Sequence, residues 1–212
     1  MKKIVLLGDS IREGYDKYVS LALDGIAEVF YPKENCRFSA FLLRHLIDWR
    51  ADMQCGDDVD LVHWNAGLWD DLIMIDGKHH TPIKCYEEYI ERLCQVIQIL
   101  FPKAKMVFAT STPVREELFI GAQKRFNKDT ERYNAAAVQI VKKHGGEIND
   151  LYAAVKNCPT HYYSDMTHLY TKEGTRLLTE RVIGAIEGAL GIHAKRLNYE
   201  ALFATPDSIT GV

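Results

Sequence analysis

The sequence has no long hydrophobic run and no excess of basic residues. No apolar stretch approaches the roughly 20 residues that a membrane-spanning helix needs. Lysine and arginine total 26 against 29 aspartates and glutamates, which gives a net charge of −3. Nucleic-acid-binding proteins usually carry a basic excess or a basic stripe. These absences predict a protein that binds neither a membrane nor a nucleic acid.

Cysteine pairs and nucleotide-binding motifs are absent as well. The five cysteines are odd in number and irregularly spaced, which favours reduced thiols over a disulfide framework or a structural zinc site. Neither G-x-G-x-x-G nor G-K-[ST] occurs, so nucleotide binding has little support. The apolar run 4–7 is shorter than the about 7–15 residues of a secretory signal. We therefore expect a cytoplasmic protein that needs no metal and no cofactor.

Short apolar segments alternate with segments of helical periodicity along the 212 residues. Strands are expected at 3–7, 27–31, 60–64, 105–110 and 147–149, and helices at 11–23, after a cap at Asn35, at 86–101, at 128–144, and from a cap at Thr171 to about 190. Such strands pair in parallel, because each long crossover covers a face of the sheet. The pattern predicts one α/β domain over 1–212, a three-layer sandwich with a five-stranded parallel sheet. The tail 191–212 is less regular, and the sequence leaves open whether it packs on the body or on a second subunit.

Polar residues follow the predicted strands at the edge where open parallel sheets bind ligands. They are Gly8-Asp9-Ser10 after the first strand, Asn65 and Gly67 after the third, and Asp165 and His168 before the last helix. A carboxylate three residues before a histidine can fix the imidazole tautomer and leave the other ring nitrogen as a general base. A serine at a strand-to-helix turn has free N–H groups beside it that favour an oxyanion. Its alternative role is to cap the helix.

Two of these segments carry a family resemblance. Gly8-Asp9-Ser10-Ile11 resembles the nucleophile block of the SGNH/GDSL hydrolase superfamily, and Asp165-x-x-His168 resembles its D-x-x-H block. Their order and context agree with that family over nearly the whole chain. The resemblance implies a flavodoxin-like SGNH hydrolase fold, with Ser10 as nucleophile, His168 as general base and Asp165 as the residue that orients it.

The second and third blocks depart from the family pattern. The segment 35–40 resembles the N-x-x-x-S-G form of block two, but Ala40 stands where glycine is usual. Block three is usually G-x-N-D, and the segment 64–70 reads WNAGLWD instead. The resemblance implies oxyanion donors in the backbone N–H groups of Ser10 and Ala40. We expect the Asn65 side chain as the third donor, with Gly67 also in the substrate-binding loop.

These residues predict a metal-independent serine esterase that cleaves small carboxylic esters through an acyl-enzyme. An O-acetyl ester on a carbohydrate is the first expectation, since aromatic residues stand near the predicted site in the sequence: Tyr15, Trp64, Trp69, Tyr162 and Tyr163. Thioesterase and lysophospholipase-type activities are alternatives. A non-catalytic, flavodoxin-like binding domain is also an open alternative. A long distance between His168 and Ser10 in the fold would favour it, and a short distance would argue against it. The expected partner is a small-molecule ester, and a homo-oligomer is left open.

Overall fold

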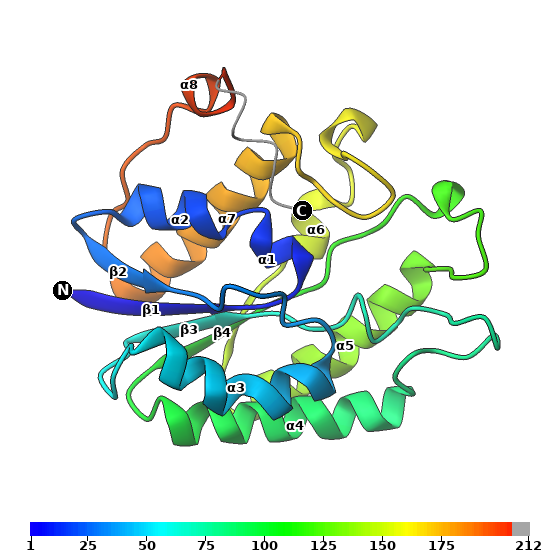
Figure 1. The fold of residues 1–212 in the computed structure, drawn as a ribbon, viewed down its shortest axis with the longest axis horizontal. Helices are drawn as coiled ribbons and strands as arrows, with labels where there is room; N and C mark the ends of the chain where they lie inside the picture. Colours follow the sequence, from blue (N-terminus) through cyan, green and yellow to red (C-terminus); the bar gives the residue numbers. More distant parts are fainter. Residues whose placement is uncertain (205–212) are drawn as a thin grey trace.

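Five short strands form a parallel sheet in the order β2-β1-β3-β4-β5 (Figure 1). The computed structural model describes residues 1–204. Its strands are β1 (Lys2–Leu7), β2 (Ala27–Phe30), β3 (Leu61–Trp64), β4 (Lys105–Ala109) and β5 (Glu147–Asn149), each parallel to its neighbours. The chain winds from β1 to one edge and then returns to β3 on the other side. The carboxyl ends of β1 and β3 therefore lie at the topological switch point, where such sheets bind ligands.

Helices cover both faces of this sheet (Figure 1). One face carries α3 (Ser39–Met53), α4 (Ile83–Leu100) and α5 (Asn127–Lys143). The other carries α1 (Ser10–Glu13), α2 (Asp16–Leu23), α6 (Leu151–Val155), α7 (Lys172–Leu190) and α8 (Tyr199–Ala204). Two short 3-10 turns lie at Glu116–Leu118 and Thr160–Tyr162. None of the helices within residues 1–204 has the length and apolarity that crossing a bilayer requires.

The alternation of β1 explains why its last four residues, 4–7, are all apolar. Val5 and Leu7 belong to the core under α3, α4 and α5, whereas Ile4 and Leu6 belong to the core under α2 and α7. Successive strand side chains point to opposite faces, and both faces of a parallel sheet are covered by helices. The predicted three-layer sandwich with a five-stranded parallel sheet is confirmed.

Two local predictions are wrong. The expected helix at 11–23 is divided into α1 and α2, with Gly14 as the C-terminal cap of α1. A Cβ at Gly14 would lie 2.7 Å from the Tyr170 ring, so this position favours glycine. Asn35 does not cap the next helix. Its Oδ1 accepts from Arg37 N, and its Nδ2 donates to Glu13, while α3 begins only at Ser39.

The last helix and residues 191–204 of the tail pack on the body of the domain. Thr171 caps α7 as predicted, because its side chain accepts a hydrogen bond from Gly174 N. The part of the tail that is described packs on α2: Lys195 N donates to Ala22 O, and the Phe203 ring stacks on Tyr18 with centroids 5.7 Å apart. The predicted tail extends to 212, and its part beyond 204 lies outside the described residues.

Candidate active site

The structure brings Ser10, His168 and Asp165 into one chain of hydrogen bonds. Ser10 begins α1, directly after β1, and His168 lies in the loop before α7. His168 Nε2 lies 2.8 Å from Ser10 Oγ, and His168 Nδ1 lies 2.7 Å from Asp165 Oδ2. In the tautomer that the carboxylate favours, Nδ1–H donates to Asp165 and Nε2 accepts the serine proton. Residues 158 positions apart in sequence are thus arranged for nucleophilic catalysis.

Asp165 is held by its own loop. Its Oδ1 accepts hydrogen bonds from Thr167 N at 2.7 Å and from His168 N at 2.8 Å. Partial burial raises the pKa of Asp165, but these backbone N–H groups and the imidazole outweigh it, and the net pKa is lowered. The carboxylate is therefore ionised at neutral pH. The side chains of His168 and Asp165 are 26% and 45% exposed, so the site is open to solvent.

Tyr170 contacts both the histidine and the serine of this triad. Its ring stacks on His168 with the centroids 4.6 Å apart and the planes at 24°. Its hydroxyl donates to Ser10 O at 2.6 Å. The sequence analysis did not find this residue. The available signal was its position, because residues i and i+2 of an extended segment point to the same side.

The turn that carries Ser10 is capped by Asp9. Asp9 is fully buried, and its Oδ1 accepts from Ile11 N and from Asn65 Nδ2, each at 3.0 Å. Burial raises the pKa of Asp9, although both hydrogen bonds act against this. Ser10 itself is the first helical residue, so the alternative role of Ser10 as the helix cap is wrong. Its hydroxyl is directed at His168 instead.

Asn65 lies at the end of β3, next to the nucleophile turn. It is 2% exposed and gives one amide hydrogen to Asp9. Its Oδ1 rests on Gly8, only 1.9 Å from where a Cβ of residue 8 would lie. Asn65 Nδ2 has a second hydrogen, which the bond to Asp9 does not use. The role of Asn65 as third donor stays a prediction.

Ala40 and Gly67 lie in the two loops that flank Asn65. Ala40 is in the first turn of α3, where N–H groups have no partner inside the helix. Within residues 1–204, its N–H forms no backbone hydrogen bond outside the helix. Gly67 is buried, and a Cβ there would lie 2.4 Å from Ser111 Oγ, so a side chain at this position would require the serine to move. Gly67 itself offers only its backbone N–H as a donor.

Arg12 joins α1 to the loop that follows β2. Its side chain is 2% exposed and donates to Asp16 at 2.5 Å, to Pro32 O at 3.1 Å and to Glu34 O at 2.8 Å. These hydrogen bonds fix α1, which carries the nucleophile, relative to the segment that leads to Ala40. Sequence reasoning missed Arg12, because an arginine two residues after the serine resembles an ordinary exposed helix residue.

Two aromatic residues expected near the site belong to the core instead. Trp64 is fully buried under α3, α4 and α5 and meets Phe108 edge-on at 4.8 Å. Tyr15 is fully buried on the opposite face and meets His63 edge-on at 6.0 Å. Proximity in sequence misleads here, because Trp64 is a strand residue whose side chain points to one face of the sheet and Tyr15 stands at the start of α2, packed on the other face.

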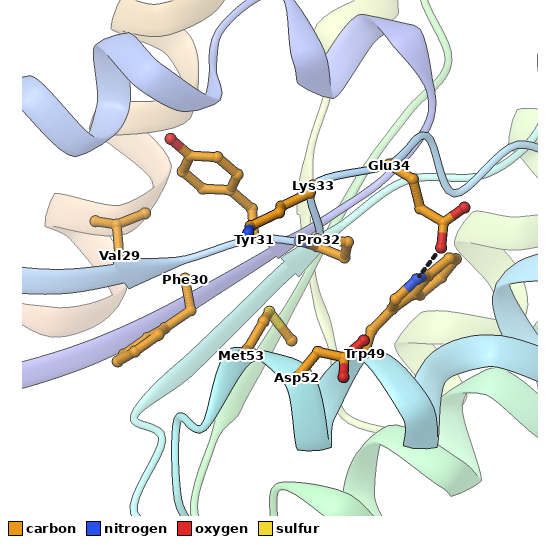
Figure 2. Close-up of a pocket in the computed structure, with 9 residues that line it drawn as sticks. All are labelled: Val29, Phe30, Tyr31, Pro32, Lys33, Glu34, Trp49, Asp52 and Met53. Carbon is orange, nitrogen blue, oxygen red and sulfur yellow. Dashed lines mark hydrogen bonds between the residues drawn. The ribbon is translucent and has the colours of Figure 1, made fainter.

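A cavity of about 540 Å³ lies away from the triad, between the edge strand β2 and α3 (Figure 2). Its lining includes Phe30, Pro32, Trp49 and Met53, and the Trp49 indole N–H donates to Glu34 Oε1 at 2.9 Å. No triad residue lines it. The cavity is therefore separate from the candidate active site.

This chain is similar to known proteins in its structure, but its sequence matches none of them. No protein-family model and no curated protein matches the sequence. The solved structure of a lipase/acylhydrolase from Enterococcus faecalis has a TM-score of 0.69 at 19% identity, over 93% of this chain and 100% of that one. An acetylxylan esterase from Geobacillus stearothermophilus has a TM-score of 0.64 at 16% identity, over 93% and 97%.

The fold is that of the SGNH hydrolases. Another acetyl xylan esterase has a TM-score of 0.68 at 18% identity, over 87% of this chain and 99% of that one. Because these similarities cover nearly the whole of each chain, the SGNH fold accounts for all the layers described above. The identities are low, so the chemistry has to be argued from the site of this chain.

Proposed function

We propose that this SGNH-fold protein is a serine hydrolase that cleaves carboxylic esters through an acyl-enzyme on Ser10. The observation that carries the proposal is the chain of hydrogen bonds from Ser10 Oγ to His168 and on to Asp165, at 2.8 and 2.7 Å. A serine alone is a weak nucleophile, and an adjacent base that is oriented by a third group activates it.

Each residue has a defined step in this reaction. Ser10 Oγ attacks the ester carbonyl while His168 Nε2 takes its proton, and Asp165 stabilises the imidazolium. The oxyanion forms beside the N–H groups of Ser10 and Ala40. His168 then gives the proton to the leaving alcohol. In the second half-reaction it activates a water that hydrolyses the acyl-enzyme.

The geometry argues against the alternative of a non-catalytic binding domain. An anion-binding loop needs the free N–H groups of α1, but it needs no imidazole on the serine and no carboxylate on the imidazole. The likeness to esterases points the same way. Two solved forms of the Geobacillus acetylxylan esterase are catalytic mutants of that protein, one with a histidine and one with a serine replaced by alanine.

Within the ester hydrolases, we infer that the substrate is an O-acetyl ester on a carbohydrate. Acetylxylan esterases are among the proteins with this fold. The partly exposed triad suits a small acyl group on a bulky, water-soluble alcohol. A lysophospholipase-type or long-chain thioesterase activity would require a place for a long acyl chain, and the cavity in Figure 2 contains no triad residue.

The test combines turnover with chemical labelling. We expect Ser10→Ala to lower kcat for p-nitrophenyl acetate by at least about 10⁴-fold, and a fluorophosphonate probe to label Ser10. Ser20→Ala, a serine on α2, is the matched control and should keep full activity. Full activity of Ser10→Ala, or labelling at a different residue, would refute the proposal.

The substrate class needs a separate panel. Acetylated xylo-oligosaccharides, acetyl-coenzyme A and p-nitrophenyl esters of increasing chain length should be compared by kcat/KM. The carbohydrate assignment predicts the highest value on the acetylated sugars and a decline beyond short acyl chains. A preference for long acyl chains would replace it with the lysophospholipase-type alternative.

A further inference from the structure

Asp70, a buried residue of the loop after β3, binds the first residue of α3 through both of its oxygens. Asp70 is fully buried. Ser39 N lies 3.0 Å from Oδ2 and 3.3 Å from Oδ1, and Ser39 Oγ donates to Oδ1 at 2.6 Å. Asp70 O in turn accepts from Thr81 N at 3.0 Å, which fixes the aspartate from its other side.

The Asp70 carboxylate caps the N-terminus of α3, although it belongs to a distant part of the chain. The residue at the N-cap position of α3, Phe38, has no side chain that can accept a hydrogen bond. The first N–H groups of a helix otherwise depend on water or on a capping side chain. Asp70 stands 31 positions from Ser39, and it holds the first turn of α3 from the neighbouring loop.

The residue after Ser39 is Ala40, whose N–H is an expected oxyanion donor. If Ser39 shifts, Ala40 shifts with it, because the two share one peptide unit. An oxyanion hole acts by donors that are already placed before charge develops. The contact between Asp70 and Ser39 is therefore suited to set the position of the Ala40 N–H.

We propose that Asp70 is a positioning residue that holds the Ala40 N–H in the oxyanion hole. This inference rests on the proposed esterase function. The oxyanion exists only in the transition state and the tetrahedral intermediate, so loss of Asp70 lowers kcat and leaves KM almost unchanged. A purely structural role would lower the thermal stability without this division between kcat and KM.

The chain supplies a matched control in the next residue. Asp71 is 1% exposed, and its Oδ2 accepts from Thr130 Oγ1 on α5 at 2.6 Å. Within residues 1–204, the Asp71 side chain forms no hydrogen bond to α3. Asp71→Asn therefore changes a carboxylate of equal burial without touching Ser39.

The experiment measures kcat and KM for p-nitrophenyl acetate in Asp70→Asn, Asp70→Ala, Ser39→Ala and Asp71→Asn, with thermal unfolding of each variant. Removal of one oxyanion donor costs about 10²–10³ in kcat, and a misplaced donor costs less. We expect Asp70→Ala to lower kcat about 10–100-fold with KM within about twofold, and Asp70→Asn and Ser39→Ala to lower kcat less. Asp71→Asn should stay within about threefold.

Two results would overturn the inference: kcat of Asp70→Asn, Asp70→Ala and Ser39→Ala all near wild type, or an equal loss in Asp71→Asn. Ser39→Ala tests the same contact if Asp70→Ala does not fold. The rate of fluorophosphonate labelling separates the two proposals. If the wild-type serine is not labelled, the esterase function fails. If wild type and the Asp70 variants are labelled equally fast, only the role of Asp70 fails.

Discussion

Gly8 makes room for the Asn65 side chain, and a single methyl group should break that packing. A Cβ at residue 8 would lie 1.9 Å from Asn65 Oδ1 and 2.9 Å from Arg12 Cβ. The φ angle of Gly8 is not positive, so alanine suits the backbone and the conflict is purely steric. In Gly8→Ala, Asn65 has to move, and it loses the 3.0 Å hydrogen bond to buried Asp9.

The cost of that movement can be worked out by comparison with Asn65→Ala. A hydrogen bond contributes roughly 0.5–1.5 kcal/mol, and Asp9 Oδ1 keeps its other partner, Ile11 N. We expect each single variant to lower the free energy of unfolding by about 1–2 kcal/mol. In the double variant only the contact with Arg12 Cβ remains, so its cost should stay near that of Asn65→Ala. The coupling energy is then about 1 kcal/mol, within the range for residues in contact.

Urea unfolding of wild type, both single variants and the double variant measures this coupling. Gly184→Ala is the matched control, because Gly184 lies in α7 and a Cβ there meets nothing within 4 Å. It should stabilise the protein by about 0.5–1 kcal/mol through helix propensity. Costs of Gly8→Ala and Asn65→Ala that add to within about 0.5 kcal/mol would refute the reasoning, because independent sites behave in that way.

Tyr170→Phe keeps the ring on His168 but loses the hydrogen bond to Ser10 O. We expect it to lower the free energy of unfolding by about 1 kcal/mol and to lower kcat slightly. Tyr170→Leu also loses the stacking on His168 and should lower kcat about tenfold. Equal kcat values for the three proteins would contradict a positioning role. Burial raises the pKa of Asp71 to about 7, so between about pH 4 and pH 7 the folded protein keeps a proton that the unfolded chain releases. The contribution of Asp71 to stability therefore falls as the pH rises through this window. The stability of Asp71→Asn relative to wild type should grow over the same window in urea unfolding, and a constant difference would contradict this assignment.

The layers of the fold were predictable because a strand that is buried on both faces has a continuous apolar sequence. The last four residues of β1 and all four of β3 are buried, and the helices between the strands are long enough to show their periodicity. Short elements lack that signal: α6 has 5 residues, about one and a half turns, and no pattern predicted it. The Tyr170 ring packs against Gly14, which lies between α1 and α2, and no local window of the sequence contains that contact.

The triad was predictable for a different reason. The serine block and the Asp-x-x-His block are local, so a short segment of sequence carries each of them. The residues that fix the geometry act over long separations: Tyr170 reaches Ser10 across 160 positions, and Asp70 reaches Ser39 across 31. A tyrosine or an aspartate in a loop has many other uses, and only the folded chain shows which one applies.

The three residues of the Gly8-Asp9-Ser10 block have separate tasks, and only the serine is placed to react. Gly8 leaves space for Asn65, and Asp9 caps α1 while it binds the same asparagine. Asn65 thus packs on the glycine and bonds to the aspartate, so the end of β3 determines the shape of the turn after β1. Asn65 stands at the strand end, in a segment that reads WNAGLWD rather than G-x-N-D, and from there it supports the serine turn directly. A substitution that preserves G-D-S but removes Asn65 should therefore disturb the nucleophile as much as a change within the motif itself.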